Sequence, residues 1–120
     1  MLGLEYETAS VYPQAISTTG HGESIMKSLL AGNIAHKLPT CSHPNQAILT
    51  SLESMTQRVG GDGGAICISS CGQVGIEWNS DRMSWASLIL DDECNSELNF
   101  GCLRGQRFKI KLSESIQMHE

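Results

Sequence analysis

Aromatic residues are scarce in this sequence of 120 residues, where Phe, Trp and Tyr together make up 5%. A hydrophobic core must therefore be built from aliphatic residues and methionine. Basic residues are also few, since 8 lysines and arginines stand against 13 aspartates and glutamates, for a net charge of -5. Because nucleic acids and anionic membrane surfaces attract basic patches, this balance argues against both as partners. No apolar run approaches the roughly 18 residues of a membrane-spanning helix.

Cysteines occur in an odd number, and no two of them form a Cys-x-x-Cys motif. The five are Cys41, Cys67, Cys71, Cys94 and Cys102. Scattered thiols are typical of a reducing compartment, and the first ten residues lack the charged start and apolar stretch of a signal peptide. We therefore expect a cytoplasmic protein. A zinc site would need more ligands than this spacing supplies, so we expect no metal ion and no other cofactor.

Hydrophobic periodicity predicts two helices in one small domain. Apolar residues recur at three- and four-residue steps over residues 24–38, and again over residues 48–59. Ser42 or His43 is a candidate cap for the second helix, with Pro44 at its first position. The Gly-rich residues 60–64 should end that helix and form a loop.

The predicted strands are short and come in two hairpins. The first joins "AICIS" to "VGIEW" through a turn that contains Gly72, and the second joins "ELNFGC" to "RFKIKL" through "LRGQ". In the last strand Phe108, Ile110 and Leu112 alternate with lysines, which indicates a sheet with one solvated face. Residues 79–93 are ambiguous. Two helices followed by four strands predict an α+β fold, with both helices on one face of an antiparallel sheet. The near-continuous apolar character of "AICIS" suggests that the other face needs a further layer.

The stretch "AISTTGHGESIMKSLL", residues 15–30, places threonines, glycines and a histidine directly before the first predicted helix. Backbone N–H groups at a helix start attract negative charge, and glycines let a ligand approach the backbone closely. A threonine hydroxyl beside such amides can act as an oxyanion donor. A plainer interpretation fits the same residues: Thr19 caps the helix, the glycines form a turn, and His21 lies at the surface.

Three blocks of the sequence resemble the plant-type L-asparaginase and isoaspartyl peptidase family, and they occur in family order. The blocks are "AISTTGHGESIMKSLLA" (15–31), "MTQRVGGDGGAICISSCGQVGIEWNSDRMSWA" (55–86) and "ELNFG" (97–101). Members of this family are N-terminal-threonine hydrolases of the Ntn type. The resemblance implies an αββα sandwich, of which this chain would hold an incomplete, C-terminal part. It also implies substrates, namely L-asparagine and β-aspartyl dipeptides.

The resemblance divides the chain and assigns roles to the opening motif. Residues 1–14 would be a divergent segment, residues 15–112 the asparaginase-like part, and residues 113–120 a tail. Thr19 and Gly20 would form the oxyanion hole, and they would bind substrate together with His21 and Gly22. Gly22 would help to hold the substrate amine, and no step of the reaction is assigned to His21.

The family's nucleophile has no counterpart in this sequence. In the family it is a threonine that autocleavage releases within a Gly-Thr-Val-Gly-like stretch, whereas none of the six threonines here is followed by Val-Gly. Thr8 is the only threonine before the motif, and its surroundings do not match. The sequence therefore predicts a truncated asparaginase-like chain that is inactive alone. Two alternatives stay open: a non-enzymatic interaction protein, and a subunit completed by another chain. We expect that the chain needs the missing N-terminal half or self-association.

Overall fold

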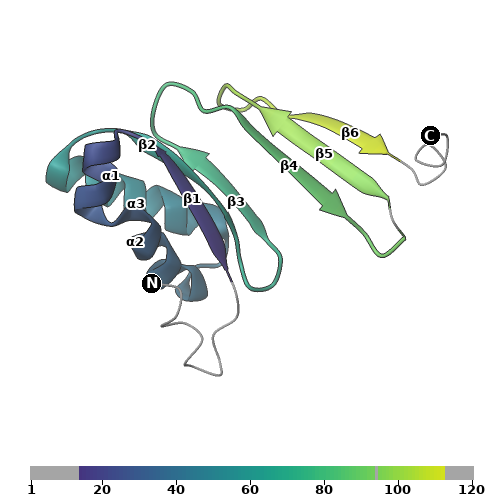
Figure 1. Ribbon diagram of the computed structural model, residues 1–120, viewed down its shortest axis with the longest axis horizontal. Helices are drawn as coiled ribbons and strands as arrows, with labels where there is room; N and C mark the ends of the chain where they lie inside the picture. The colour runs from purple at the N-terminus through teal and green to yellow at the C-terminus, as the bar shows by residue number, and fades with distance from the viewer. Residues whose placement is uncertain (1–13, 94, 113–120) are drawn as a thin grey trace. The chain divides into compact units, whose positions relative to one another are not determined.

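The computed structural model describes residues 14–93 and 95–112. The chain divides into two compact units, with the boundary between Ser80 and Asp81. Figure 1 shows the helices and three strands of the first unit, and the three strands of the second. The predicted N-terminal segment and tail, with Thr8 and Cys94, fall outside the described residues, apart from Gln14.

The described part of the first unit contains helices on one face of a small sheet. In chain order its elements are β1 (Ala15–Gly20), α1 (Gly22–Ser28), α2 (Leu30–Lys37), the 3-10 helix η2 (Leu38–Thr40), α3 (Pro44–Val59), β2 (Gly63–Ile68) and β3 (Val74–Trp78). The strands are antiparallel in the order β1-β2-β3. The helices pack on the same side of this sheet (Figure 1), which is the arrangement that the sequence predicts.

The core of the first unit lies between these helices and the sheet. It consists of aliphatic residues, a methionine and a cysteine: Leu30, Ile34, Leu38, Ala47, Ile48, Leu52, Met55, Ala65 and Cys67. Small residues on the strands bring α3 close to the sheet. At Gly75 of β3, a Cβ atom would lie 2.7 Å from both the Cys67 sulfur and the Pro44 Cβ atom. The start of α3 therefore rests directly on the backbone of β3.

The start of α3 is fixed by the residues that the sequence indicates. His43 is its N-cap and accepts a hydrogen bond at Nδ1 from the backbone N–H of Asn45, while Pro44 occupies the first turn. Asn45 in turn accepts a hydrogen bond from the backbone N–H of Ile76 at 2.8 Å. Asn45 therefore takes part both in the helix cap, through its N–H, and in the contact with β3, through its side chain.

The open face of this sheet, which points away from the helices, is apolar and partly exposed. Because side chains alternate along a strand, Ile66 and Ile68 lie opposite the buried Ala65 and Cys67. Ile66 is 43% exposed and Ile68 is 51% exposed. Among the described residues of the first unit, Ile66 and Ile68 are therefore left exposed on this face, as expected for a face that needs a further layer.

The predicted single helix over residues 24–38 is wrong, because Leu29 divides it into α1 and α2. Leu29 adopts φ 51° and ψ 52°, which is the left-handed region. The Asn33 side chain donates to the Ser28 carbonyl at 2.7 Å and its backbone N–H donates to the Leu29 carbonyl at 2.9 Å. Apolar periodicity continues across the break, so the sequence pattern gives no sign of it.

Replacing Leu29 with glycine is expected to raise the free energy of unfolding by about 0.5–1 kcal/mol. The left-handed conformation costs an L-residue about 1–2 kcal/mol and costs glycine little, although the more flexible unfolded chain offsets part of the gain. Little packing is lost, because Leu29 is 72% exposed. Met26, 71% exposed inside α1, provides the control, since Met26→Gly should lower stability by about 1 kcal/mol. Urea unfolding of both variants checks the prediction, and equal destabilisation would contradict it.

The described part of the second unit is an antiparallel sheet in the order β4-β5-β6. Its strands are β4 (Trp85–Leu90), β5 (Ser96–Gly101) and β6 (Phe108–Leu112). The last two confirm the predicted second hairpin, and β4 arises from the stretch that the sequence leaves ambiguous. Phe100 stacks on Phe108 with ring centroids 5.2 Å apart, and the Arg107 guanidinium lies 5.4 Å from the ring centre of the buried Trp85.

One face of this second sheet is apolar and exposed. The pairing register aligns Leu88, Leu98 and Ile110 across the three strands, and it aligns Phe100 with Phe108. Leu88 is 61% exposed, Phe108 50% and Ile110 45%. The lysines of β6 lie on the opposite face, as predicted, but the apolar face is open as well. The reason is that residues 81–93 and 95–112 contain no helix to cover it.

The α+β class is therefore confirmed, while the sheet composition differs from the prediction. The described chain has six strands in two sheets, where the sequence predicts four strands in one. This arrangement is compatible with part of an αββα sandwich. Within residues 14–93 and 95–112, no helix combines the length and apolar character that crossing a membrane requires.

The described thiols differ in how readily they should ionise. Cys41, Cys67, Cys71 and Cys102 are free. Burial raises the pKa of the Cys67 thiol, and a backbone hydrogen bond to Gly75 offsets this only in part. Cys71 is exposed at the β2–β3 turn, and its pKa is lowered, chiefly by a hydrogen bond from the Ser69 side chain.

Cys71 is expected to react with iodoacetamide at lower pH in the folded chain than in the urea-unfolded chain. A lowered pKa means that the thiolate, which is the nucleophile, forms at lower pH. Cys67 should react only after unfolding. Peptide mapping by mass spectrometry across a pH series measures both, and Ser69→Ala is the control that should move the Cys71 curve to higher pH. Coincident folded and unfolded curves for Cys71 would contradict the prediction.

Candidate functional site

The motif that the sequence singles out spans the end of β1 and the start of α1. Thr18, Thr19 and Gly20 are the last residues of β1, His21 is the N-cap of α1, and Gly22 is its first residue. The interpretation of Thr19 as the helix cap is wrong, because Thr19 belongs to a strand and His21 takes the cap position. The His21 side chain makes no capping hydrogen bond to α1.

Glycines form the end of the ladder in which Thr19 lies. Thr19 pairs with Gly64, and Gly20 pairs with Gly63. Gly20 has φ 132°, and a Cβ atom there would lie 2.5 Å from both the Asp62 carbonyl oxygen and the Gly63 Cα atom. Only glycine fits at position 20, because a side chain would meet backbone atoms in a backbone conformation that L-residues rarely adopt.

Strand alternation places Thr19 on the sheet face away from the helices. Its neighbour Thr18 pairs with Ala65, which is buried in the helix-facing core. Thr19 pairs with the next residue, Gly64, and therefore points to the other face. Thr19 and Gly20 are both exposed. The predicted oxyanion residues thus lie on the open face of the sheet rather than inside the first unit's core.

The loop between α3 and β2, residues 60–62, is held by hydrogen bonds from two further side chains. The Thr56 hydroxyl donates to the Gly61 carbonyl at 2.8 Å, and it accepts from the Asn79 side-chain amide at 2.9 Å. Asn79 also exchanges two bonds with Gly63: its Oδ1 accepts from the Gly63 N–H, and its own N–H donates to the Gly63 carbonyl, both at 2.9 Å. The loop is therefore fixed on the side of α3 and β3.

His21 connects the motif to this loop with two hydrogen bonds. Its backbone N–H donates to the Asp62 carbonyl at 3.0 Å. The Asp62 backbone N–H donates back to His21 Nδ1 at 2.7 Å. Contact is close as well, because a Cβ atom at Gly61, whose φ is 85°, would meet the Ser24 side chain and lie 3.2 Å from the His21 Cβ atom.

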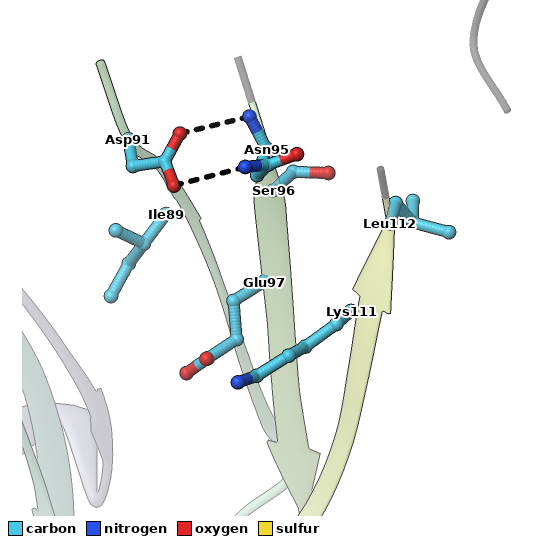
Figure 2. A pocket seen from close by; sticks show the side chains of 7 residues that line it. All are labelled: Ile89, Asp91, Asn95, Ser96, Glu97, Lys111 and Leu112. Carbon is cyan, nitrogen blue, oxygen red and sulfur yellow. Dashed lines mark hydrogen bonds between the residues drawn. The ribbon is translucent and has the colours of Figure 1, made fainter. Parts of the chain in front are cut away.

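A separate cavity of about 480 Å³ lies in the second unit (Figure 2). Its acidic groups have local partners. The Asp91 carboxylate accepts from the backbone N–H groups of Glu93 and Asn95 at 2.9 Å, and the Asn95 hydrogen bond is the main reason that the pKa of Asp91 is lowered. The pKa of Glu97 is also lowered, first by the Asn99 side-chain amide and then by Lys109 and Lys111. These contacts close the β4–β5 turn and pair the strands.

Among the residues that the structure describes, no three His, Cys, Asp or Glu side chains lie close enough together to hold a metal ion.

One ion pair lies next to the motif. Glu23, in the first turn of α1, forms an exposed ion pair with Lys27 at 3.0 Å. Exposed pairs of this kind contribute at most about 1 kcal/mol, so they do not shape the site.

Comparison with known proteins decides the family. A family model described as asparaginase matches residues 9–95. This chain belongs to the asparaginase family. Its relatives include an isoaspartyl peptidase/L-asparaginase of Xenopus laevis, which is 38% identical over 102 residues, covering 85% of this chain and 31% of the relative. A probable isoaspartyl peptidase/L-asparaginase of Drosophila pseudoobscura pseudoobscura is 41% identical over 81 residues, or 64% of this chain and 24% of the relative.

The human isoaspartyl peptidase/L-asparaginase shows the same relation, with 41% identity over 73 residues that cover 61% of this chain and 24% of the relative. The asparaginase-family chain therefore spans about a third or less of the curated relatives that it matches. The resemblance that the sequence motifs indicate is confirmed. The roles assigned to Thr19, Gly20, His21 and Gly22 remain predictions.

The structure adds three residues to the candidate site of this asparaginase-family chain. Thr56, Asn79 and Asp62 hold the loop against which the motif lies, and the sequence pattern gives none of them a role. The sequence signal nearest to these residues is the glycine-rich composition of residues 60–64, which predicts a loop. In the structure, Gly63 and Gly64 belong to β2. The composition does not predict that the loop contacts the motif.

Proposed function

We propose that this chain is a truncated asparaginase-like protein that carries the carbonyl-polarising part of an amidohydrolase site and is inactive alone. One observation carries the proposal. Thr19 and Gly20 lie at the end of β1, opposite Gly64 and Gly63 of β2, while none of the six threonines has the sequence context of the family's nucleophile. The relatives named isoaspartyl peptidase/L-asparaginase support L-asparagine and β-aspartyl peptides as the substrates of a completed site.

In the proposed chemistry, the Thr19 hydroxyl and the Gly20 N–H donate hydrogen bonds to the substrate carbonyl oxygen, while His21 and Gly22 contact the substrate. Such donors stabilise the oxyanion of a tetrahedral intermediate and are each worth about 10²–10³ in rate. They act only when a nucleophile attacks the carbonyl carbon. In the family, that nucleophile is a threonine hydroxyl activated by its own α-amine. Without it, the polarised amide has nothing to react with.

The test is to incubate the purified chain with L-asparagine and with a β-aspartyl dipeptide, and to measure ammonia and the released amino acid. We expect no product above the buffer control for the wild type, for Thr19→Ala, or for Thr18→Ala, the matched control on the other sheet face. Turnover that Thr19→Ala abolishes and Thr18→Ala retains would overturn the proposed inactivity. Sequencing the transcript upstream of Met1 for a Gly-Thr-Val-Gly-like segment would show whether a longer precursor encodes the nucleophile.

The second candidate is a binding role in which another chain, or a second copy, completes the fold. The exposed apolar faces of both sheets favour it, because large open apolar patches commonly mark interaction surfaces. Size-exclusion chromatography is the direct measurement: self-association supports this candidate, whereas a compact, soluble monomer of 13.0 kDa would contradict the need for a partner layer. We also propose a cytoplasmic location, which the scattered thiols support.

A further inference from the structure

We infer that His21 is a positioning residue, which fixes the register of Thr19 and Gly20 through its Nδ1 atom. The inference rests on the proposed function in one respect: the residues that His21 positions are the proposed carbonyl-polarising pair. It assigns His21 a role through its neighbours and no contact with the reacting atoms.

The end of the β1–β2 ladder lacks the side chains that normally fix a register. Gly20 faces Gly63, and Thr19 faces Gly64. Strand register is set by the pattern of side chains and is weakly specified where glycines replace them. A slip of one residue would turn Thr19 from the open face to the helix-facing side. Some other contact must therefore hold this end of the strand.

His21 supplies that contact directly beyond the glycines. Its backbone N–H donates to the Asp62 carbonyl at 3.0 Å, and its Nδ1 accepts from the Asp62 N–H at 2.7 Å. Both bonds would break if β1 slipped by one residue. Asp62 is a firm partner because its neighbours are fixed, Gly61 by Thr56 and Gly63 by Asn79.

The same geometry determines where the imidazole carries its proton. A backbone N–H is always a donor, so Nδ1 must offer its lone pair, and the neutral ring then carries its hydrogen on Nε2. Nδ1 is thereby excluded as a general base, since its lone pair is already engaged. The motif histidine is a structural acceptor, and only an acceptor at the Nδ1 position can replace it.

Nuclear magnetic resonance on the full chain tests this tautomer. For the neutral imidazole, we expect a through-hydrogen-bond coupling between the Asp62 amide nitrogen and His21 Nδ1, and a hydrogen on Nε2. A neutral ring that carries its hydrogen on Nδ1 would overturn the inference. This measurement needs no variant, so it stands even if a substitution prevents folding.

Substitutions then separate hydrogen bonding from packing. The side-chain oxygen of asparagine can replace Nδ1 as an acceptor, whereas the longer glutamine side chain does not place an acceptor there. In His21→Gln we expect the Asp62 amide to exchange about five- to tenfold faster, which is what losing a hydrogen bond of typical net strength would produce. The NMR chemical shifts of the Thr19 and Gly20 amides should also change in His21→Gln. His21→Asn should stay within about threefold of the wild-type exchange rate by the same measure, and His36→Gln, at an exposed position of α2, is the matched control.

Unchanged exchange at Asp62 in His21→Gln, or equal loss in His21→Asn and His21→Gln, would contradict the role of Nδ1. None of these measurements involves hydrolysis of asparagine. The inference about His21 can therefore fail while the proposed function stands, and the proposed function can fail while the hydrogen bond is found.

Discussion

Alanine at position 20 is expected to lower the free energy of unfolding of the first unit by about 2–6 kcal/mol. Gly20 has φ 132°, and its Cβ position lies 2.5 Å from the Asp62 carbonyl oxygen and from the Gly63 Cα atom. Backbone strain of this kind costs about 1–3 kcal/mol, and overpacking adds about 1–3 kcal/mol. Because both clashing atoms belong to the backbone, no side-chain rotation relieves them.

Urea unfolding followed by circular dichroism measures this loss. Gly22→Ala is the matched control, because it lies two residues further on with nothing within 4 Å of its Cβ position, and it should change stability by less than about 0.5 kcal/mol. Similar losses in the two variants would mean that the close contact at Gly20 does not determine the effect. In the Gly20 variant we also expect weaker protection of the Asp62 amide, because the ladder that leads to it is distorted.

Leu52→Ala is expected to lower the free energy of unfolding by about 2–5 kcal/mol. Leu52 is 0% exposed and belongs to the cluster that holds α2 and α3 against the sheet. Removing its side chain loses the hydrophobic transfer energy and leaves a cavity. Aromatic side chains are absent from this described cluster, so nothing large is available to collapse into the space.

The measurement is again chemical denaturation, with Val59→Ala as the control from the same helix. Val59 is the last residue of α3 and is 41% exposed, so truncating it should cost less than about 1 kcal/mol. A loss below about 1 kcal/mol for Leu52→Ala would show that the helices are not held to the sheet by this cluster.

Much of the first unit could be predicted from local sequence signals. His43 and Pro44 mark the start of α3 because capping needs only neighbouring residues. The turn at Gly72, where φ is 87°, follows from the preference of glycine for that conformation. The break at Leu29 could not be predicted, because apolar periodicity runs through it and the bonds that stabilise it depend on the fold.

Strand β1 illustrates the limit of local patterns. "AISTTG" is short and rich in hydroxyl groups, which is equally typical of a loop before a helix. It becomes a strand by pairing with β2, some fifty residues later in the chain. The family resemblance assigns roles to the four motif residues, and these roles remain predictions. The hydrogen bonds between His21 and Asp62, 41 residues apart, could not be predicted without knowing that β1 pairs with β2.

The open apolar face of β4, β5 and β6 has a consequence for the abundance of the chain. Exposed leucine, isoleucine and phenylalanine side chains on this face favour association with other apolar surfaces, and so favour aggregation. The rate of such encounters rises with concentration, and cellular chaperones and proteases remove chains that expose these surfaces. When this polypeptide is expressed alone at a high level, the concentration of soluble chain should therefore reach a limit, and the exposed face of the second sheet is the reason for that limit.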